Sequence, residues 1–190
     1  MILDLISANR SYRRFHQEES IREEMLRELV NLARLSPSGA NLQPLKYILS
    51  VDREKNALIF DHLAWAGYLS DWDGPEEGER PAGYIVVLGD REIKENAGCD
   101  HGIAAQSILL GAVEKGLGGC IFGSIQRKKL REALNIPERY DILIIIALGV
   151  PAEEVKIEEA EVDGDIKYWR DSNAVHHVPK RPLDEIILDL

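Results

Sequence analysis

The chain has 190 residues and a mass of 21.4 kDa, which is long enough for one domain with a sizeable core. Apolar residues make up 45% and charged residues 29%, so the composition excludes a disordered or fibrous chain. The formal net charge of −10 disfavours general binding of nucleic acid or of anionic membranes, because the overall field repels phosphate. Any bound anion must therefore be held by a local group of cations.

Membrane segments and metal sites are also disfavoured. The longest strongly apolar run, residues 142–150, is less than half of the about 20 residues that a spanning helix needs. The N-terminus lacks the pattern of a secretory signal, so we expect a cytoplasmic protein. Cys99 and Cys120 are not at metal-ligand spacing, and His176 and His177 would point in opposite directions on an extended segment, so no metal site is predicted.

The first predicted element is an amphipathic helix over residues 20–35. Ser20 and Glu23 match a capping box at its start, and Pro37 stops it. A turn and then a strand are predicted next, over residues 37–44 (PSGANLQP) and 46–51 (KYILSV).

A second helix is predicted over residues 56–68, followed by a loop over residues 74–81. Trp65, Tyr68 and Trp72 recur near helical spacing on one face of this region. Such a face is more often core than lid, although aromatic rings can also stack on a substrate. We expect Trp65 in the core and Trp72 in a small lid.

The second half of the chain alternates apolar strands and helices. A helix that begins at Asp100 carries apolar residues around nearly its whole circumference, so it must be surrounded by protein. Strands are predicted at residues 84–89, 120–122 and 142–149, and a short helix at 128–134. The last strand is so apolar that both of its faces must be covered. Residues 153–165 are acidic and predict a solvated connection, and the apolar end of the chain could extend a strand on this subunit or on a partner. This order predicts a single α+β domain over residues 1–190.

Residues 9–15 (NRSYRRF) concentrate positive charge in an acidic chain. Arg10, Arg13 and Arg14 lie within five residues, beside the hydroxyl of Ser11. A phosphate monoester needs several charge-assisted donors, and guanidinium groups supply them in pairs without losing their protons. The segment is therefore a candidate oxyanion site; the alternative is a solvated basic patch that pairs with acidic surface.

A second basic pair lies near the other end of the chain. Lys180 and Arg181 stand between Pro179 and Pro182, in a stiff extended segment. If both ends of the chain meet, a single phosphate would gain four or more donors. Taken alone, such a pair is most often solvated, and sequence spacing leaves both possibilities open.

The turn at residues 37–44 has the composition of a loop that approaches a flat or polar ligand. Gly39 leaves space, and Asn41 and Gln43 offer amide donors and acceptors, although an ordinary turn after a helix has the same residues. The glycines of residues 116–123 do not match a dinucleotide-binding motif, because they follow a helix and precede a strand. No nucleophile with its base can be identified, so a cofactor would supply the chemistry of an enzyme.

Five motifs along nearly the whole chain, in this order, resemble the nitroreductase family of flavin-dependent oxidoreductases. They are NRSYRRF, ARLSPSGANLQP, DHGIAAQSILLGAVEKGLGGC, REALNIPE with IIIALGVP, and VPKRPLDEII. The resemblance implies a three-layer α+β sandwich, with a mostly antiparallel central sheet flanked by helices. It also implies a homodimer formed through the long central helix, with FMN bound in two equivalent sites at the interface.

The resemblance assigns cofactor-binding roles residue by residue. It implies that the phosphate is bound by Arg10, Ser11 and Arg13 together with Lys180 and Arg181. It also implies that a loop reaches the flavin of the opposite subunit, with Pro37, Ser38, Gly39, Asn41 and Gln43. Gly123 and Ser124 would lie near the flavin ring. The chain departs from many members at Asn9, where a second basic residue is common, and at Leu45, where a Trp is common.

The activity implied by the resemblance is a ping-pong transfer of hydride from NADH or NADPH, through FMN, to an organic acceptor such as a nitroaromatic or a quinone. No catalytic side chain is required, because the flavin carries the chemistry. The main alternative is a flavin- or phosphate-binding protein without turnover, a carrier or sensor on the same fold. An enzyme that processes phosphoesters is a more distant alternative, since the sequence offers it no metal site or nucleophile.

Overall fold

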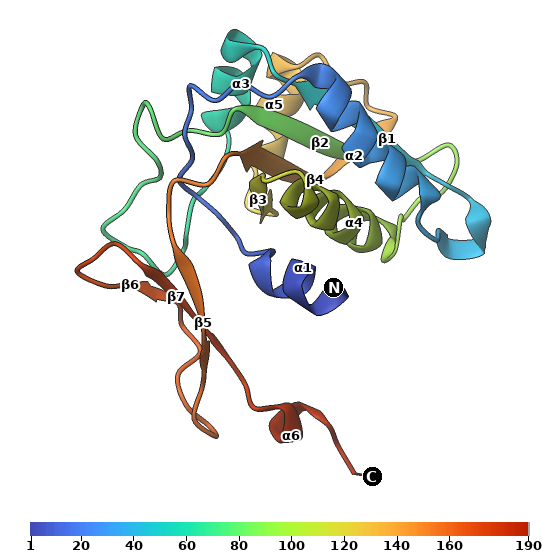
Figure 1. The fold of residues 1–190 in the computed structure, drawn as a ribbon. Coiled ribbons are helices and arrows are strands. Elements are labelled where there is room, and N and C mark those ends of the chain that lie inside the picture. Colours follow the sequence, from blue (N-terminus) through green and yellow to red (C-terminus); the bar gives the residue numbers. More distant parts are fainter. Residues whose placement is uncertain (190) are drawn as a thin grey trace.

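An antiparallel sheet of four strands forms the centre of the fold, and the computed structural model describes residues 1–189 of the chain (Figure 1). In spatial order the strands are β1 (Leu45–Ser50), β2 (Gly83–Asp90), β4 (Tyr140–Gly149) and β3 (Gly118–Phe122). β2 and β4 pair along almost their full lengths, with one irregularity in register between Val87 and Leu88. Their β-branched residues fit a sheet that is buried on both faces.

Helices cover both faces of this sheet. One face carries α2 (Glu23–Leu35) and α4 (Asp100–Glu114), and the other carries α3 (Arg53–Phe60) and α5 (Arg127–Ala133) (Figure 1). Side chains of β4 alternate between two apolar clusters, with Ile146 on the α2–α4 side and Ile145 on the α3–α5 side. The three-layer α+β arrangement and the coverage of both faces of β4 are thus confirmed.

Two helix boundaries differ from prediction. α2 begins at Glu23 with Arg22 as its N-cap and without a side-chain cap, so the capping box predicted at Ser20 is wrong. The reason is the burial of Ile21, whose side chain packs in the α2–α4 cluster and keeps the preceding backbone non-helical. α3 begins at Arg53, where Asp52 accepts a hydrogen bond from the Lys55 backbone N–H at 2.9 Å.

The helix predicted over residues 56–68 ends at Phe60. Beyond it, Leu63 forms a β-bridge with Ile125, and this contact with the loop after β3 replaces further helical turns. Trp65 is buried in the α3–α5 cluster against Phe122, as predicted. Trp72 packs partly buried against the same cluster, so the lid expected there is wrong.

The remaining elements lie at the two ends of the chain. α1 (Ile2–Ala8) lies beside α4, and residues 151–189, here called the C-terminal arm, extend away from the central sheet (Figure 1). The arm holds β5 (Val155–Glu159), β6 (Trp169–Arg170), β7 (His176–Lys180) and α6 (Leu183–Ile186), with strand order β5-β7-β6.

The prediction of a solvated connection over residues 153–165 is wrong in part. The segment contains β5, which pairs with β7 in parallel. The Glu153 side chain is only 1% exposed, because it makes ion-pair and hydrogen-bond contacts with neighbouring segments.

The apolar end of the chain does not extend a strand on this subunit. Ile186 is the last residue of the short helix α6, and residues 187–189 form no strand. Leu190, the last residue of that apolar end, lies outside the described residues. Within residues 1–189, no helix is both long and apolar enough to cross a membrane.

Candidate functional site

The N-terminal basic segment runs beside the edge of the central sheet. The Tyr12 backbone N–H donates to the Gly119 carbonyl of β3 at 3.0 Å, and Ser11 forms a parallel β-bridge with Gly119. A Cβ at Gly118 would collide with the ring of Tyr12. Glycine at that position therefore allows the basic segment to lie directly on β3.

Side chains from both ends of the chain meet around one cavity of about 320 Å³, here called the basic cavity. Arg10, Ser11 and Arg13 line it from the N-terminal segment, and Lys180 lines it from β7. The remaining lining residues are Asn9, Gln106, Leu109, Gly119, Ile121, Tyr168, His176 and Val178. None of these residues is acidic. The two basic clusters of the sequence thus converge, apart from Arg14 and Arg181.

Ion pairing separates the basic residues into two groups. Arg14 pairs with Glu79, and Arg181 pairs with Glu185. In contrast, Arg10, Arg13 and Lys180 form no ion pair with any of the residues 1–189. The three cations that line the basic cavity are the uncommitted ones, which is the arrangement that an oxyanion requires.

Arg10 has spare hydrogen-bonding capacity. One of its terminal nitrogens donates to the Ile6 carbonyl at 2.8 Å, whereas its buried Nε has no partner in the described structure. Burial lowers the pKa of Arg10, but a guanidinium remains charged at any physiological pH. A buried N–H without an acceptor is costly, so a bound anion would relieve this cost.

Arg13 is held from two sides by the C-terminal arm. Its guanidinium lies 4.8 Å from the centre of the Tyr168 ring, and its Nη1 donates to His176 Nε2 at 3.1 Å. His176 is 1% exposed; burial, with the nearby charges of Arg13 and Arg170, lowers its pKa to about 4. The imidazole is therefore neutral near pH 7 and can accept this hydrogen bond.

The neighbouring His177 faces the other way, as predicted. Its Nδ1 lies 2.6 Å from Glu158 Oε1 and its Nε2 3.3 Å from Asp171 Oδ2. The hydrogen bond to Glu158, with that to Asp171, raises the pKa of His177. Within residues 1–189, no group of His, Cys, Asp or Glu side chains could hold a metal ion.

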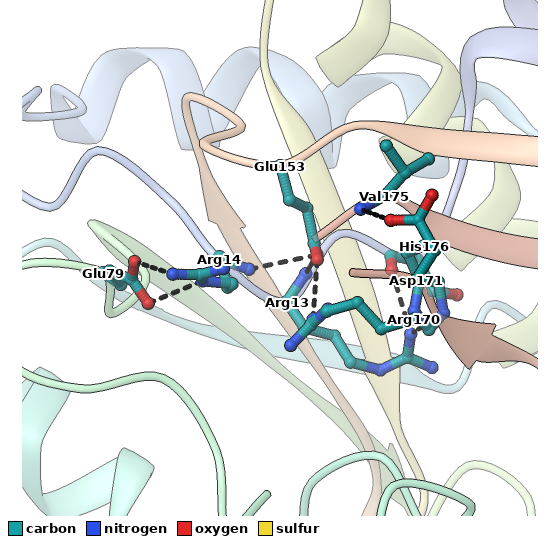
Figure 2. A network of polar contacts seen from close by, with 9 residues as sticks. Arg13, Arg14, Glu79, Glu153, Arg170, Asp171, Val175 and His176 are labelled. Atoms are coloured by element: carbon teal, nitrogen blue, oxygen red, sulfur yellow. Dashed lines mark hydrogen bonds and ion pairs between the residues drawn. The ribbon is translucent and has the colours of Figure 1, made fainter. Parts of the chain in front are cut away.

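Glu153 fastens the arm to the basic segment, as Figure 2 shows. Its carboxylate accepts hydrogen bonds from the backbone N–H groups of Arg13 and Arg14 and from the Arg170 guanidinium at 2.9 Å. This single buried carboxylate therefore joins three segments of the chain. Because it holds the backbone of Arg13, it also fixes one wall of the basic cavity.

The loop over residues 37–43 lies at a second cavity, of about 270 Å³. Pro37, Ser38 and Gln43 line this cavity together with Tyr47 and Asp100. Burial, with the negative charge of Asp100, raises the pKa of Tyr47 to about 12, so its hydroxyl stays protonated. None of these residues lines the basic cavity of the same chain.

The other predicted site residues lie outside both cavities. Gly39 donates its backbone N–H to Asp100 Oδ1 at 3.0 Å, and Asn41 is exposed. Gly123 is exposed in the loop after β3, and the Ser124 carbonyl accepts from the Ala64 backbone N–H at 3.1 Å. The structure thus groups the predicted residues into the basic cavity, the 37–43 loop and the loop after β3.

Several residues of the basic cavity were not predicted as site residues, among them Tyr168, Gln106 and His176. Tyr168 lies in no motif, and nothing in the sequence distinguishes it from other surface residues. Gln106 lies in the motif that begins at Asp100, but the resemblance assigned no role to it. His176 was considered only as a metal ligand. Its place opposite the basic segment follows from the alternation of side chains along β7, which sends His177 to the other face.

The structure therefore combines an α+β fold with a cavity that is lined by basic residues from both ends of the chain. The sequence model of the nitroreductase family matches residues 6–150, and the chain belongs to that family. The predicted resemblance is thereby confirmed. The match includes the basic segment, the 37–43 loop and the whole central sheet, whereas the C-terminal arm lies beyond it.

Known relatives agree with this assignment. A protein of Archaeoglobus fulgidus, provisionally named an NADH dehydrogenase/NAD(P)H nitroreductase, is 28% identical over 84% of this chain and 90% of its own length. The structure of an FMN-dependent nitroreductase from Clostridium difficile is 26% identical, with a TM-score of 0.65 over 80% of this chain and 88% of that chain. A nitroreductase family protein from Streptococcus pneumoniae is 17% identical and shows the same fold, with a TM-score of 0.74 over all of both chains.

Proposed function

We propose that this chain is an FMN-dependent oxidoreductase that uses NADH or NADPH to reduce a small organic acceptor, such as a nitroaromatic or a quinone, in a ping-pong cycle. The observation that carries the proposal is the set of uncommitted cations, Arg10, Arg13 and Lys180, around a cavity without an acidic residue. Membership of the nitroreductase family supports it. The FMN dependence stated for the Clostridium difficile relative supports the choice of cofactor.

The residues of the basic cavity fit the phosphate of FMN. Two guanidinium groups and an ammonium group can supply charge-assisted donors, and the buried Arg10 Nε has an unused N–H. The hydroxyl of Ser11 adds a further donor at the same cavity. Arg181 points to Glu185 instead, so we assign the C-terminal contribution to Lys180.

The protein would contribute position and electrostatic field. When bound, FMN would supply the hydride chemistry, which no side chain of this chain offers. Arg10, Arg13 and Lys180 would anchor the cofactor through its phosphate. Neutral His176 keeps Arg13 oriented by accepting its hydrogen bond, and Glu153 fixes the backbone of Arg13 from behind. These contacts preorganise the site before a ligand arrives.

We further propose that the functional unit is a homodimer with its two flavin sites at the interface. The residues of the 37–43 loop and those of the basic cavity form separate sites in one chain, and a second subunit would allow both to reach one flavin. Apolar side chains support an interface along α1, α2 and α4. The exposed ones are Ile2, Leu3, Ile6, Leu32, Leu35 and Ile103. Exposed apolar surface of this extent is typical of a contact between proteins.

The assignment of the basic cavity can be tested by titrating the apoprotein with FMN and with riboflavin, which lacks the phosphate. Arg10→Ala and Arg13→Ala should each weaken FMN binding by about 1.5–3 kcal/mol, the usual value of a hydrogen bond to a charged group. Neither should change riboflavin binding. Arg14→Ala is the matched control, because Arg14 pairs with Glu79 and does not line the cavity. Unchanged FMN affinity in both cavity variants would contradict the assignment.

The dimer proposal has a separate test. Flavin content can be measured across a dilution series while the oligomeric state is followed by analytical ultracentrifugation. We expect flavin to be released as dimers dissociate, because each site would draw on two chains. A demonstrated monomer that keeps its full flavin content would rule out the shared site.

A further inference from the structure

A buried carboxylate at the start of α4 organises the 37–43 loop. Asp100 is 5% exposed, and its Oδ2 accepts a hydrogen bond from Ser38 Oγ at 2.6 Å. Its Oδ1 accepts from the Gly39 backbone N–H at 3.0 Å. Both oxygens of one side chain are therefore committed to the beginning of the loop, and a helix of the central fold is tied to it.

Ser38 passes this constraint on to the end of the loop. While its hydroxyl donates to Asp100, its oxygen accepts from the Gln43 backbone N–H at 2.9 Å. One hydroxyl group thus joins the two ends of the loop. In addition, Gln43 Nε2 donates to the Asn41 carbonyl at 3.1 Å, which links the two amide residues.

The loop needs such support because its backbone is strained. Ala40, Asn41 and Gln43 have φ angles of 50°, 56° and 53°, in the left-handed region that residues other than glycine seldom adopt. The shape of the loop must therefore be imposed by its contacts. Within the described residues, the hydrogen bonds of Asp100 and Ser38 close the loop at both ends.

The environment keeps Asp100 ionised. Burial alone would raise its pKa, but the hydrogen bonds from Ser38 and Gly39, with the nearby charge of Lys94, hold the pKa of Asp100 below its usual value. Its position in the first turn of the 15-residue helix α4 also favours negative charge. An ionised carboxylate can accept both hydrogen bonds at once.

We propose that Asp100 is a positioning residue that acts through Ser38 to fix the 37–43 loop in the shape that presents Asn41 and Gln43 to the flavin ring. This inference rests on the proposed function and assigns Ser38 a structural part in the loop. Because the Ser38 hydroxyl already donates its proton to Asp100, it has no donor left for a ligand, and we assign the donors of the loop to its amide side chains and backbone.

The experiment compares Asp100→Ala and Ser38→Ala with two controls. Ser38→Thr keeps the hydroxyl. Ser36→Ala removes a neighbouring hydroxyl that bonds to Leu32 and Ser107. That hydroxyl takes no part in the hydrogen bonds from Asp100 through Ser38 to Gln43, here called the relay. The first readout is amide hydrogen exchange of residues 39–43 in the apoprotein. The second is the affinity of each variant for FMN and for riboflavin.

We expect Asp100→Ala and Ser38→Ala to raise amide exchange in the loop and to weaken FMN and riboflavin binding by the same factor, about tenfold or more. The equal effect distinguishes a contact to the ring from one to the phosphate, because Arg13→Ala should affect FMN alone. Ser38→Thr and Ser36→Ala should match the wild type. If Asp100→Ala fails to fold, Ser38→Ala carries the same test.

Two results would overturn the inference. Faster exchange with unchanged affinity for both flavins would make Asp100 a purely structural residue. If amide exchange of the loop is unchanged in both Asp100→Ala and Ser38→Ala, the hydrogen bonds of the relay do not hold the loop. A wild-type protein that binds neither flavin would overturn the proposed function itself, and the inference with it.

Discussion

Different forces stabilise the central sheet and the C-terminal arm. β2 is buried along its whole length, and helices pack apolar side chains on both faces of the sheet. The arm has a small three-stranded sheet whose strands are mostly half-buried or exposed, and it is fastened by polar and aromatic contacts. The most important of these join Glu153 to the backbone of the basic segment and Arg13 to His176.

The central sheet therefore accounts for the stability of the fold, whereas the arm completes the basic cavity. The central sheet positions the basic segment and the 37–43 loop, and the family match covers this part of the chain. The arm lies beyond the family match but supplies Tyr168, His176 and Lys180 to the basic cavity. We therefore expect core substitutions to unfold the protein and arm substitutions to open the cavity.

The largest effect on the free energy of global unfolding is expected in the central sheet. Ile146→Ala should lower the free energy of unfolding by about 2–5 kcal/mol, because the side chain is fully buried between the sheet and its helices. Urea denaturation measures this change. Ile157→Ala in β5 is the matched control, since Ile157 is exposed and should shift stability by no more than about 0.5 kcal/mol. Equal effects at the two positions would remove the contrast between the regions.

Removal of Glu153 should open the arm and leave the core intact. Glu153→Ala deprives Arg170 of its partner, and breaking a buried ion pair costs about 3–5 kcal/mol. We expect faster proteolysis within the arm and weaker FMN binding, with little change in unfolding of the central sheet. Glu154→Ala is the control, because Glu154 pairs only at the surface with Lys156. Loss of cooperative unfolding in the core would show that the arm is part of it.

The attachment of the arm should depend on pH through His176. Its pKa is about 4 in the folded protein, below the ordinary value of 6.5. His176 therefore binds a proton more readily when the arm is open. The contribution of His176 to closure is fully present above pH 6.5 and is lost as the pH falls toward 4. The loss is at most about 3 kcal/mol. Proteolysis rates across this range measure closure. His176→Gln should remove this part of the pH dependence, and an unchanged profile would exclude His176 as its source.

The smallest effect concerns the contact between Tyr68 and the arm. Tyr68 is 55% exposed, and its ring lies 4.9 Å from that of Tyr168. Tyr68→Ala should weaken the closure of the arm by about 0.5–1.5 kcal/mol, the usual value of an aromatic pair. The proteolysis assay used for Glu153 detects such a shift. If Tyr68→Ala weakened the closure of the arm more than Glu153→Ala does, the aromatic contact would be the stronger of the two, contrary to this prediction.

Patterns within one element could be predicted from the sequence. The apolar run of β4 indicated burial on both faces, and the structure confirms it. The all-round apolar surface of α4 predicted a helix surrounded by protein, but only part of α4 is buried and Ile103 is exposed in the single chain. The basic clusters were also visible, because arginines so close together stand out in an acidic chain. Each of these signals depends on residues that are neighbours in the sequence.

Features that depend on distant contacts could not be predicted. Glu153 lies in an acidic run, and only its contacts with Arg13, Arg14 and Arg170 distinguish it from its solvated neighbours. The start of α2 depends on the burial of Ile21, which competes with the capping signal at Ser20. In both cases tertiary packing outweighs local preference.

The proposed function requires that this chain binds FMN and reduces it with a nicotinamide. The most direct measurement is the visible absorbance spectrum of the protein, purified or loaded with FMN, before and after anaerobic addition of NADH or NADPH. We predict a yellow protein whose flavin band bleaches with at least one donor. A flavin band that neither donor bleaches would favour a carrier or sensor without turnover. A colourless protein that takes up no added FMN would contradict the account and leave only the fold in common with the family.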